Sequence, residues 1–529
     1  MQHTIRKQII DLWVHNKLDA RALQQRVSDR FWIDIVPVLE EYFDKIADAE
    51  TTVKIERLEI DLGLISEEMI DRGEWGALFR EKLELQFQEK MMDVTLEHGG
   101  IMIPHVDNAF AQWLYFIEHG HLPWNAGRPS EQWFSQVLES LAGNYNSAAA
   151  IRKLLADNTI AAERIVLHHS PEFLSHLVEL LTAENQSTLP AAVRELAAWL
   201  HTINMRYSAT TSLTPKAIER KAWIKILQKA STEQAKHCTS DIITFLIMRW
   251  LQFTRESLSA LIRLQPLQQV LTHIEPVVAA ILKGASDMEL RGPENKHATP
   301  ETPVSQDRKE NTNAPLQEEA GKEQQARKEP TTELPEHTAT QISSRLRKEK
   351  VSEDPLMQEQ IIPGEGIYIT HAGLILLHPF IHTLFKKLEY VKEGKFIDEA
   401  MQERAVCLLH ELATGTPLQE YDLVIEKLLC AWPMHLPVDT SIELTNLEKE
   451  EAQNLLLAAI EQWPILRNTT PPALQETFLQ RGGKLEFRNG KWYLQVEKIP
   501  VDILLSHLPW MISMIKLPWM KELLMVEWT

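Results

Sequence analysis

The side chains of this chain that could do chemistry include two histidines in its C-terminal third. His378 and His382 lie four residues apart in "HPFIH", a spacing that can place two imidazoles on one helix face around a zinc ion. Pro379 lies between them, and no glutamate follows the first histidine as the zinc-protease motif requires. Histidines that cap or line a helix end are the simpler interpretation, and the pair gives no metal prediction.

A second pair, Cys407 and His410, lies three residues apart in "RAVCLLHELA" and could in principle activate a thiolate. Apolar residues flank the cysteine on both sides, which favours a buried structural thiol. The histidines of "LHHSPEFLSH", which are His168, His169 and His176, have no carboxylate or thiolate nearby at a metal-binding spacing. An enzyme that uses the Cys407/His410 or the His378/His382 pair stays as a third hypothesis.

Motifs for phosphate binding and nucleophilic catalysis are absent from the sequence. It contains no G-x-x-x-x-G-K-[ST], no G-x-G-x-x-G and no G-x-S-x-G. Gly482 and Gly483 come before a predicted strand, which favours a turn. Acidic clusters such as "LEKEEAQ" are typical of polar helix faces in a chain with 74 Asp and Glu residues. We therefore predict no catalytic residue, no cofactor and no metal site.

Tryptophan is the residue type that stands out, with 15 in 529 residues. Tryptophan is costly to expose and is enriched at interaction hot spots. Both a core role and an interaction role are open for these side chains. The candidate core or interaction residues are Trp124, Trp432, Trp463, Phe487, Trp492, Trp510, Trp519 and Trp528.

Composition limits the classes of partner and site. A formal charge of −19 argues against duplex DNA or an anionic membrane as the main partner. The apolar closing stretch "LPWMISMIKLPWM" is broken by Lys516 and Pro518, so no membrane insertion is predicted. Cys238, Cys407 and Cys430 have no metal-like spacing and are read as reduced, buried thiols of a protein made in the cytoplasm. The N-terminus shows no secretory signal.

The first half of the chain divides into two predicted domains. Residues 1–93 read as a small α+β domain, with "TIRKQIIDLWV" and "TVKIERLEIDLG" as strands. Between these strands we expect helices, with Asp19 as an N-cap and Pro37 opening or kinking the second helix. Residues 106–285 show helical periodicity without a fixed repeat, which predicts an irregular helical domain.

Residues 286–363 are predicted to be a disordered linker. No Phe, Tyr or Trp occurs between 254 and 367, and the segment is rich in Glu, Lys, Gln, Thr and Pro. Such a composition cannot bury enough apolar surface to offset the entropy of ordering the chain.

The C-terminal domain is predicted to begin with helices and to end in strands. Residues 364–480 form its helical part, in which Asp398 is an N-cap and Gly415 a helix stop. In residues 481–529, Asn489-Gly490 predicts a type I′ hairpin that pairs Phe487 with Trp492. "MISMIKL" and "LLMVEW" are candidates for a third and a fourth strand. The predicted fold class is mainly α, multi-domain, with small α+β units at both ends and a long disordered linker.

Several long strings in the C-terminal half resemble one known family. They include "HAGLILLHPFIHTLFKKL", "ERAVCLLHELATG", "EKLLCAWP", "LQETFLQRGGKLEFRNGKWYLQVE" and "DILLSHLPWMISMIKLPWMKELLMVEW". Near the N-terminus, "VKIERLEIDLG" and "IEHGHLPW" look like other pieces of the same family. The sequence is similar to the contractile injection system tape measure proteins, which belong to extracellular, phage-tail-like particles.

The resemblance implies a structural, non-enzymatic role in setting tube and sheath length or as a baseplate and tube assembly hub. It implies inner tube, spike and baseplate proteins as partners, and the net charge predicts no nucleic acid among them. It also implies a cytoplasmic location during assembly and a later place in the tube lumen or baseplate. A soluble chaperone or adaptor for tube subunits or cargo, absent from the mature particle, is the alternative.

Overall fold

The computed structural model describes residues 5, 8–14, 20–46, 51–55, 57–96, 102–207, 214–232, 237–264, 271–283 and 366–528. The predicted linker 286–363 and the predicted N-cap Asp19 lie outside these residues. The chain divides into two compact units. Unit 1 combines residues 1–184, 227–236 and 351–529, and unit 2 combines residues 185–226 and 237–350.

Four helices form the N-terminal block of unit 1: α1 (Ala20–Asp34), α2 (Val36–Ile46), α3 (Glu67–Arg72) and α4 (Trp75–Leu96). Pro37 is the second residue of α2, where a missing N–H costs no helical hydrogen bond, so this prediction is confirmed. The helices share one apolar core that includes Val27, Ile35 and Leu83. Trp75 donates from Nε1 to the Asp34 carboxylate at 2.7 Å and ties α4 to α1.

The strands predicted in this block are largely wrong. The described residues of "TIRKQIIDLWV" form no strand, and the Trp13 side chain is 97% exposed. In "TVKIERLEIDLG" the described ladder is limited to β1 (Thr51–Val53), which pairs antiparallel with β2 (Met102–Pro104). Leu58, Ile60 and Leu62 instead pack, partly buried, against the helical core. The alternating pattern indicates that one side of the segment is buried. An extended segment that packs on helices produces this pattern as well as a strand in a sheet does.

Unit 1 continues with α5 (His105–His119), α6 (Trp133–Gly143), α7 (Tyr145–Asp157), α8 (Thr159–His168) and α9 (Pro171–Thr182). Side chains of Asn144, Asn158 and Ser170 cap α7, α8 and α9 by accepting backbone N–H groups of the first turn. Short polar residues between the helices therefore set the helix boundaries here. Unit 2 contains α10 (Leu189–Tyr207), α12 (Thr239–Phe245), α13 (Arg255–Leu264) and α14 (Ile274–Lys283). Helix α11 (Pro215–Thr232) runs from unit 2 into unit 1.

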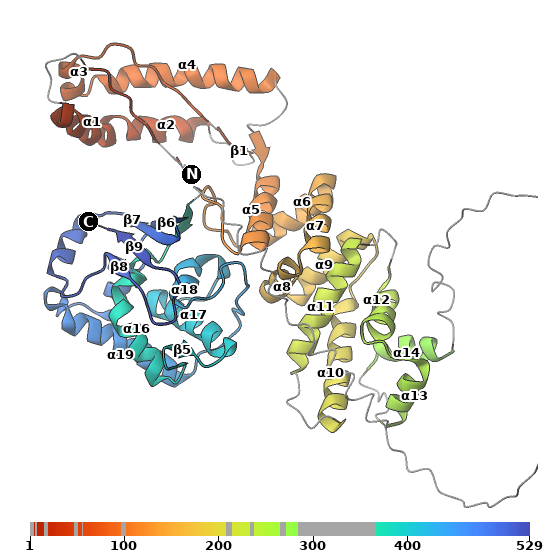
Figure 1. Cartoon of the computed structure of the whole chain (residues 1–529). Helices are drawn as coiled ribbons and strands as arrows, with labels where there is room; N and C mark the ends of the chain where they lie inside the picture. The colour runs from red at the N-terminus through yellow and green to blue at the C-terminus, as the bar shows by residue number, and fades with distance from the viewer. Residues whose placement is uncertain are drawn as a thin grey trace, which may run out of the picture. The chain divides into compact units, whose positions relative to one another are not determined.

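The C-terminal segment of unit 1 alternates short helices and strands (Figure 1). Its helices are α16 (His378–Lys387), α17 (Glu399–Thr414), α18 (Val424–Leu429), α19 (Asn446–Gln462) and α20 (Pro471–Leu474), with 3-10 turns at Ala372–Leu377, Glu420–Asp422 and Pro500–His507. Helix α17 begins and ends as predicted, because the Asp398 carboxylate accepts from the Met401 N–H and Gly415 is left-handed.

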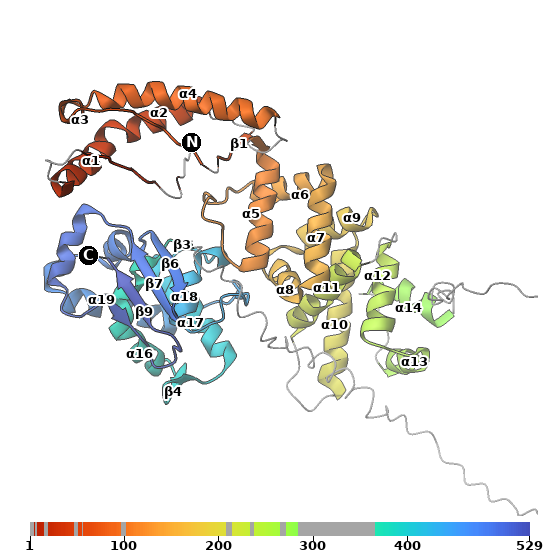
Figure 2. The same ribbon diagram turned by 45° about the horizontal axis from the view of Figure 1, so that its top comes forward.

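A five-stranded mixed sheet has the order β3 (Ile367–Ile369), β6 (Gly483–Arg488), β7 (Lys491–Val496), β9 (Leu524–Glu527) and β8 (Met514–Ile515) (Figure 2). The hairpin is confirmed, with Phe487 opposite Trp492 and with positive φ at Asn489 and Gly490. The strand in "LLMVEW" is confirmed as β9, which lies parallel to β7. The strand in "MISMIKL" covers two residues and pairs with β9 at the sheet edge, since prolines lie on both sides of it.

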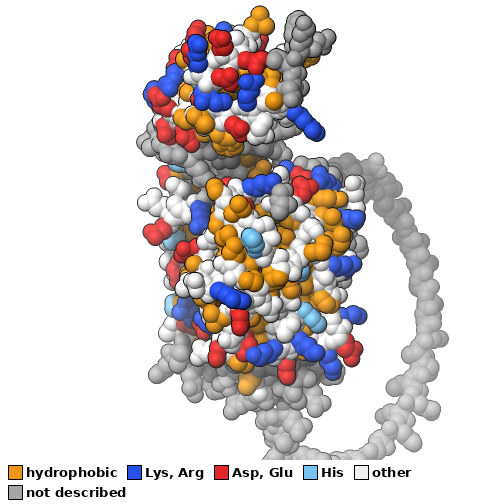
Figure 3. Space-filling view, turned by 90° about the vertical axis from the view of Figure 1, so that its left-hand side faces the viewer, with side chains coloured by type: hydrophobic (Ala, Val, Ile, Leu, Met, Phe, Trp, Pro, Cys, Tyr) orange, Lys and Arg blue, Asp and Glu red, His pale blue; other side chains and the backbone are white. Residues whose placement is uncertain are grey.

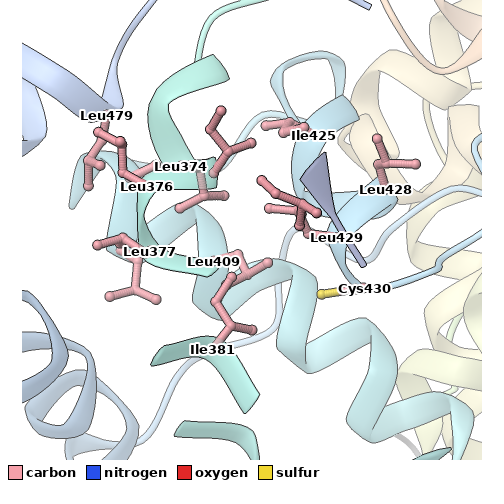
Figure 4. Close-up of a cluster of buried hydrophobic side chains, with 14 of the residues drawn as sticks. Leu374, Leu376, Leu377, Ile381, Leu409, Ile425, Leu428, Leu429, Cys430 and Leu479 are labelled. Atoms are coloured by element: carbon pink, nitrogen blue, oxygen red, sulfur yellow. The ribbon is translucent and has the colours of Figure 1, made fainter. Parts of the chain in front are cut away.

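The largest apolar core fills the space between this sheet and the helices. Figure 4 shows part of it, where Leu374, Leu376 and Leu377 of the first 3-10 turn meet Ile381 of α16 and Leu409 of α17. Leu428 and Leu429 of α18 reach the same cluster, so α18 is buried. The chain is mainly helical with small sheets near its ends, which confirms the predicted fold class.

Candidate functional site

The tryptophans named from the sequence lie mostly in the C-terminal core. Trp432, Trp463, Trp492 and Trp528 are buried, while Trp124, Phe487, Trp510 and Trp519 are partly buried. Trp463 Nε1 has no hydrogen-bond partner among the described residues. Side chains of this size contribute mainly by the apolar area they bury.

Trp510 and Trp519 of the repeated "LPWM" perform similar structural tasks. Trp510 donates from Nε1 to the Leu376 carbonyl at 3.0 Å and meets the Phe380 ring edge-on. Trp519 donates to the Leu429 carbonyl at 2.7 Å and stacks on Phe385. Each indole therefore packs against helices on one side and satisfies a buried carbonyl on the other. Together the two indoles hold the closing stretch onto the domain.

The members of the His378/His382 pair have different contacts, and Cys407 of the second pair is buried. His378 Nδ1 lies 3.0 Å from the Ile375 carbonyl at the start of α16, and the His382 ring lies against Trp519. Cys407 is buried, and burial raises the pKa of its thiol to about 12. A thiol with such a pKa is protonated at neutral pH and is a poor nucleophile.

A cluster of buried charged side chains joins α8 to the C-terminal segment. We call it the Glu420 cluster; its members are Arg164, His168, Glu420 and Lys427. Arg164 Nε donates to both Glu420 carboxylate oxygens at 3.2 Å across 256 positions of sequence. Lys427 Nζ donates to Glu420 at 2.6 Å, and His168, the first histidine of "LHHS", donates to it from Nε2. The side chains of Arg164 and Glu420 have no solvent exposure.

Backbone carbonyls complete the coordination of the two cations. Arg164 donates to the carbonyls of Ile117 and His435, each at 2.5 Å. Lys427 donates to the Leu436 carbonyl at 2.9 Å. Because every charge has several partners, the cluster meets the condition under which buried ions are tolerated. It satisfies both of its cations and its one carboxylate.

Gly120, in "IEHGHLPW", ends α5 next to this cluster. Its φ of 81° lies in the left-handed region, and its N–H donates to the Phe116 carbonyl. A Cβ at this position would lie 2.8 Å from an Arg164 guanidinium nitrogen and 3.2 Å from the Met434 carbonyl oxygen. Both the backbone conformation and the space therefore require glycine here.

Aromatic side chains add further contacts between the same two parts of unit 1. Tyr421 meets Phe116 edge-on at 5.8 Å and Trp133 at 6.1 Å between ring centroids. Burial raises the pKa of the Tyr421 hydroxyl to about 12. The Glu420 cluster and these aromatic contacts therefore both connect the helices of residues 105–182 to the C-terminal segment within unit 1.

The charges in the Glu420 cluster change each other's titration. Burial alone would raise the pKa of Glu420, but Arg164, Lys427 and the hydrogen bond from His168 hold it well below its usual range. Burial lowers the pKa of Lys427 against the opposing effect of Glu420. The carboxylate is therefore ionised at neutral pH and favours the folded state.

A second polar cluster, six residues along the chain, is built differently. We call it the Glu426 cluster; its members are His371, His410 and Glu426, all buried. His371 Nδ1 lies 2.7 Å from Glu426 Oε1, and His410 Nδ1 lies 4.0 Å from the same oxygen. Among the described residues, Glu426 Oε2 and His410 Nδ1 have no hydrogen-bond partner.

Sequence reasoning missed both clusters. It found no carboxylate near His168, because the partner Glu420 comes from the other end of unit 1. It also placed the glutamates of "LEKEEAQ" on a polar helix face, yet Glu448 is buried and accepts from Arg404 and Tyr390. For Glu448, the local signal in the sequence was the capping box that it forms with Thr445 at the start of α19.

The surface of the molecule is a mixture of apolar and charged side chains. Figure 3 shows hydrophobic side chains spread over one face with charged side chains among them. In residues 366–528 the most exposed large apolar side chains are Met511 and Ile503. Within the described part of the chain, no helix is both long and apolar enough to cross a membrane.

Comparisons with known proteins complete this description. No curated protein and no solved structure matches the chain. The profile of one family, described as contractile injection system tape measure protein, matches residues 2–528. That family is structural, and its name places its members within a contractile injection particle. Since the match covers nearly the whole chain, this protein belongs to the contractile injection system tape measure proteins.

Proposed function

We propose that this protein sets the length of the tube and sheath of a contractile injection particle, and that unit 1 acts as its folded assembly hub. Family membership over residues 2–528 supports the length-determining role. The Glu420 cluster supports the hub, because it ties residues from both halves of the chain into one unit. On this proposal the inner tube, the spike and the baseplate proteins are the partners.

The Glu420 cluster limits how such a chain could measure length. A continuous helix of 529 residues would span roughly 800 Å, at about 1.5 Å per residue. Because Arg164 is bonded to Glu420, the chain between these two residues begins and ends at the same place and cannot form one continuous extended helix. Unit 1 can stay folded while the parts of the chain between its pieces, which include residues 237–350, differ in length. We propose that the measuring segment lies there.

In-frame deletions and duplications inside 291–350 test the length role. Particle length is measured by electron microscopy of purified particles. Each ten residues removed should shorten the sheath, by at most about 35 Å if the segment is extended and by about 15 Å if it is helical. Unchanged particle length across the series would refute the measuring segment. Glu420→Gln is the matched variant, which should lower particle yield without changing particle length.

Retention in the particle separates the proposal from the chaperone alternative. Mass spectrometry of sheathed particles should find peptides from both unit 1 and unit 2. A protein that is needed for assembly but absent from mature particles would be a chaperone or adaptor instead. Loss of particles in Cys407→Ala with a native circular dichroism spectrum would contradict a purely structural role.

A further inference from the structure

We propose that His371, His410 and Glu426 form a binding site for a zinc ion that stabilises the C-terminal part of unit 1. The three residues come from different elements: His371 precedes the 3-10 turn Ala372–Leu377, His410 lies on α17 and Glu426 lies on α18. One ligand atom from each lies within 4.8 Å of the others. The elements that build the core therefore also bring these ligands together.

The spacing of the ligand atoms fits a small tetrahedral ion. Zinc binds imidazole nitrogen and carboxylate oxygen at about 2.0–2.2 Å, so two of its ligand atoms lie about 3.3–3.5 Å apart. His371 Nδ1 and His410 Nδ1 lie 2.7 Å and 4.0 Å from Glu426 Oε1, on either side of that value. Shifts of well under 1 Å per ligand would bring both distances to it. Two histidines with one carboxylate are an established ligand set for zinc.

Two polar atoms of the cluster point to a ligand. Glu426 Oε2 and His410 Nδ1 are buried and have no partner among the described residues. An unpaired buried polar atom costs about 1–3 kcal/mol, and native proteins rarely leave one. The Glu420 cluster shows that this domain can satisfy a buried carboxylate fully. A metal ion bound by His410 Nδ1 and by both oxygens of the Glu426 carboxylate would satisfy both atoms at once.

The surroundings hold the three ligands in place and away from solvent. His410 Nε2 lies 3.2 Å from the Thr414 hydroxyl, which orients the ring and leaves Nδ1 for the ion. Glu426 is not exposed at all, and both histidines are buried. Because all three ligands are buried, the ion would contribute to folding.

Metal content of the untagged full-length chain tests the site. Protein produced in zinc-supplemented medium should carry about one equivalent of zinc per chain by mass spectrometry. His410→Asn removes the imidazole ligand, Glu426→Gln keeps the size of the side chain while it removes the charge, and both variants should lose that equivalent. His378→Asn is the control, since His378 lies outside the cluster and contacts the Ile375 carbonyl. The control should keep its zinc.

Cobalt substitution keeps the test decisive if a ligand variant fails to fold. The wild-type chain reconstituted with Co²⁺ should show the visible absorption of a four-coordinate site at one equivalent. Thr414→Val keeps all three ligands and should weaken metal affinity about tenfold, as loss of a supporting hydrogen bond does. A wild-type chain without bound zinc or cobalt, or ligand variants that retain the metal, would overturn the proposal.

Discussion

Glu420 and Glu426 lie six residues apart, and both are buried in the same domain, yet their surroundings are opposite in kind. Glu420 accepts from Arg164, His168 and Lys427. Glu426 meets one histidine closely and keeps one oxygen without a partner. A carboxylate with all its partners holds structural elements together. A buried carboxylate oxygen without a hydrogen-bond partner is suited to bind a cation. The sequence alone could not distinguish these two kinds of buried glutamate.

The largest effect is expected for Glu420→Gln. The substitution removes the one carboxylate shared by two buried cations, and breaking a buried pair costs about 3–5 kcal/mol. Urea denaturation of the full chain, followed by tryptophan fluorescence, measures the change in the free energy of unfolding. A loss under about 1 kcal/mol would show that the cluster does not hold α8 to the C-terminal segment.

Acid should weaken the Glu420 cluster specifically. The folded-state pKa of Glu420 lies well below its unfolded value, so its contribution is present above about pH 4.3 and falls as the pH drops toward the folded pKa. Between pH 5 and pH 3 the wild type should lose about 2 kcal/mol from this group. Glu420→Gln should show a correspondingly flatter pH dependence of stability. Identical slopes in the two proteins would contradict the depressed pKa.

Gly120→Ala should disturb the same cluster without removing a charge. The substitution strains a left-handed residue and presses Cβ against the Arg164 guanidinium group, at an expected cost of about 1–2 kcal/mol. Differential scanning calorimetry would record the shift in Tm. Gly143→Ala is the control, because nothing lies within 4 Å of its added Cβ and its φ is not left-handed. Equal shifts for both variants would exclude a role for the close approach.

The smallest effect is expected for Glu426→Gln in metal-free protein. Glutamine still accepts from His371, and it removes a carboxylate oxygen that already lacks a partner. The free energy of unfolding should therefore change by less than about 1 kcal/mol. Urea denaturation with a chelator present measures it. A loss as large as that of Glu420→Gln would erase the difference between the two clusters.

Sequence reasoning succeeded where the signal was local. Asn489-Gly490 specifies its turn and its register within a few residues, and Asp398 and Gly415 mark the two ends of α17 by capping chemistry. It failed where a partner comes from far along the chain. Nothing near Arg164 indicates a glutamate 256 positions away. Strand β3 likewise pairs with the distant strand β6, with Ile367 opposite Leu485. Alternation alone also misled, since "TVKIERLEIDLG" buries one side against helices.

The Glu420 cluster also decides which changes of chain length this protein can tolerate. The entropy lost on closing a loop grows with the logarithm of its length, so doubling the span between Arg164 and Glu420 would cost only about 0.6 kcal/mol. The cluster, stabilised by several kcal/mol, would stay closed. Insertions and deletions in the part of that span that lies outside unit 1 can therefore accumulate while the folded unit is unchanged, and family members that build longer or shorter particles are expected to share one hub.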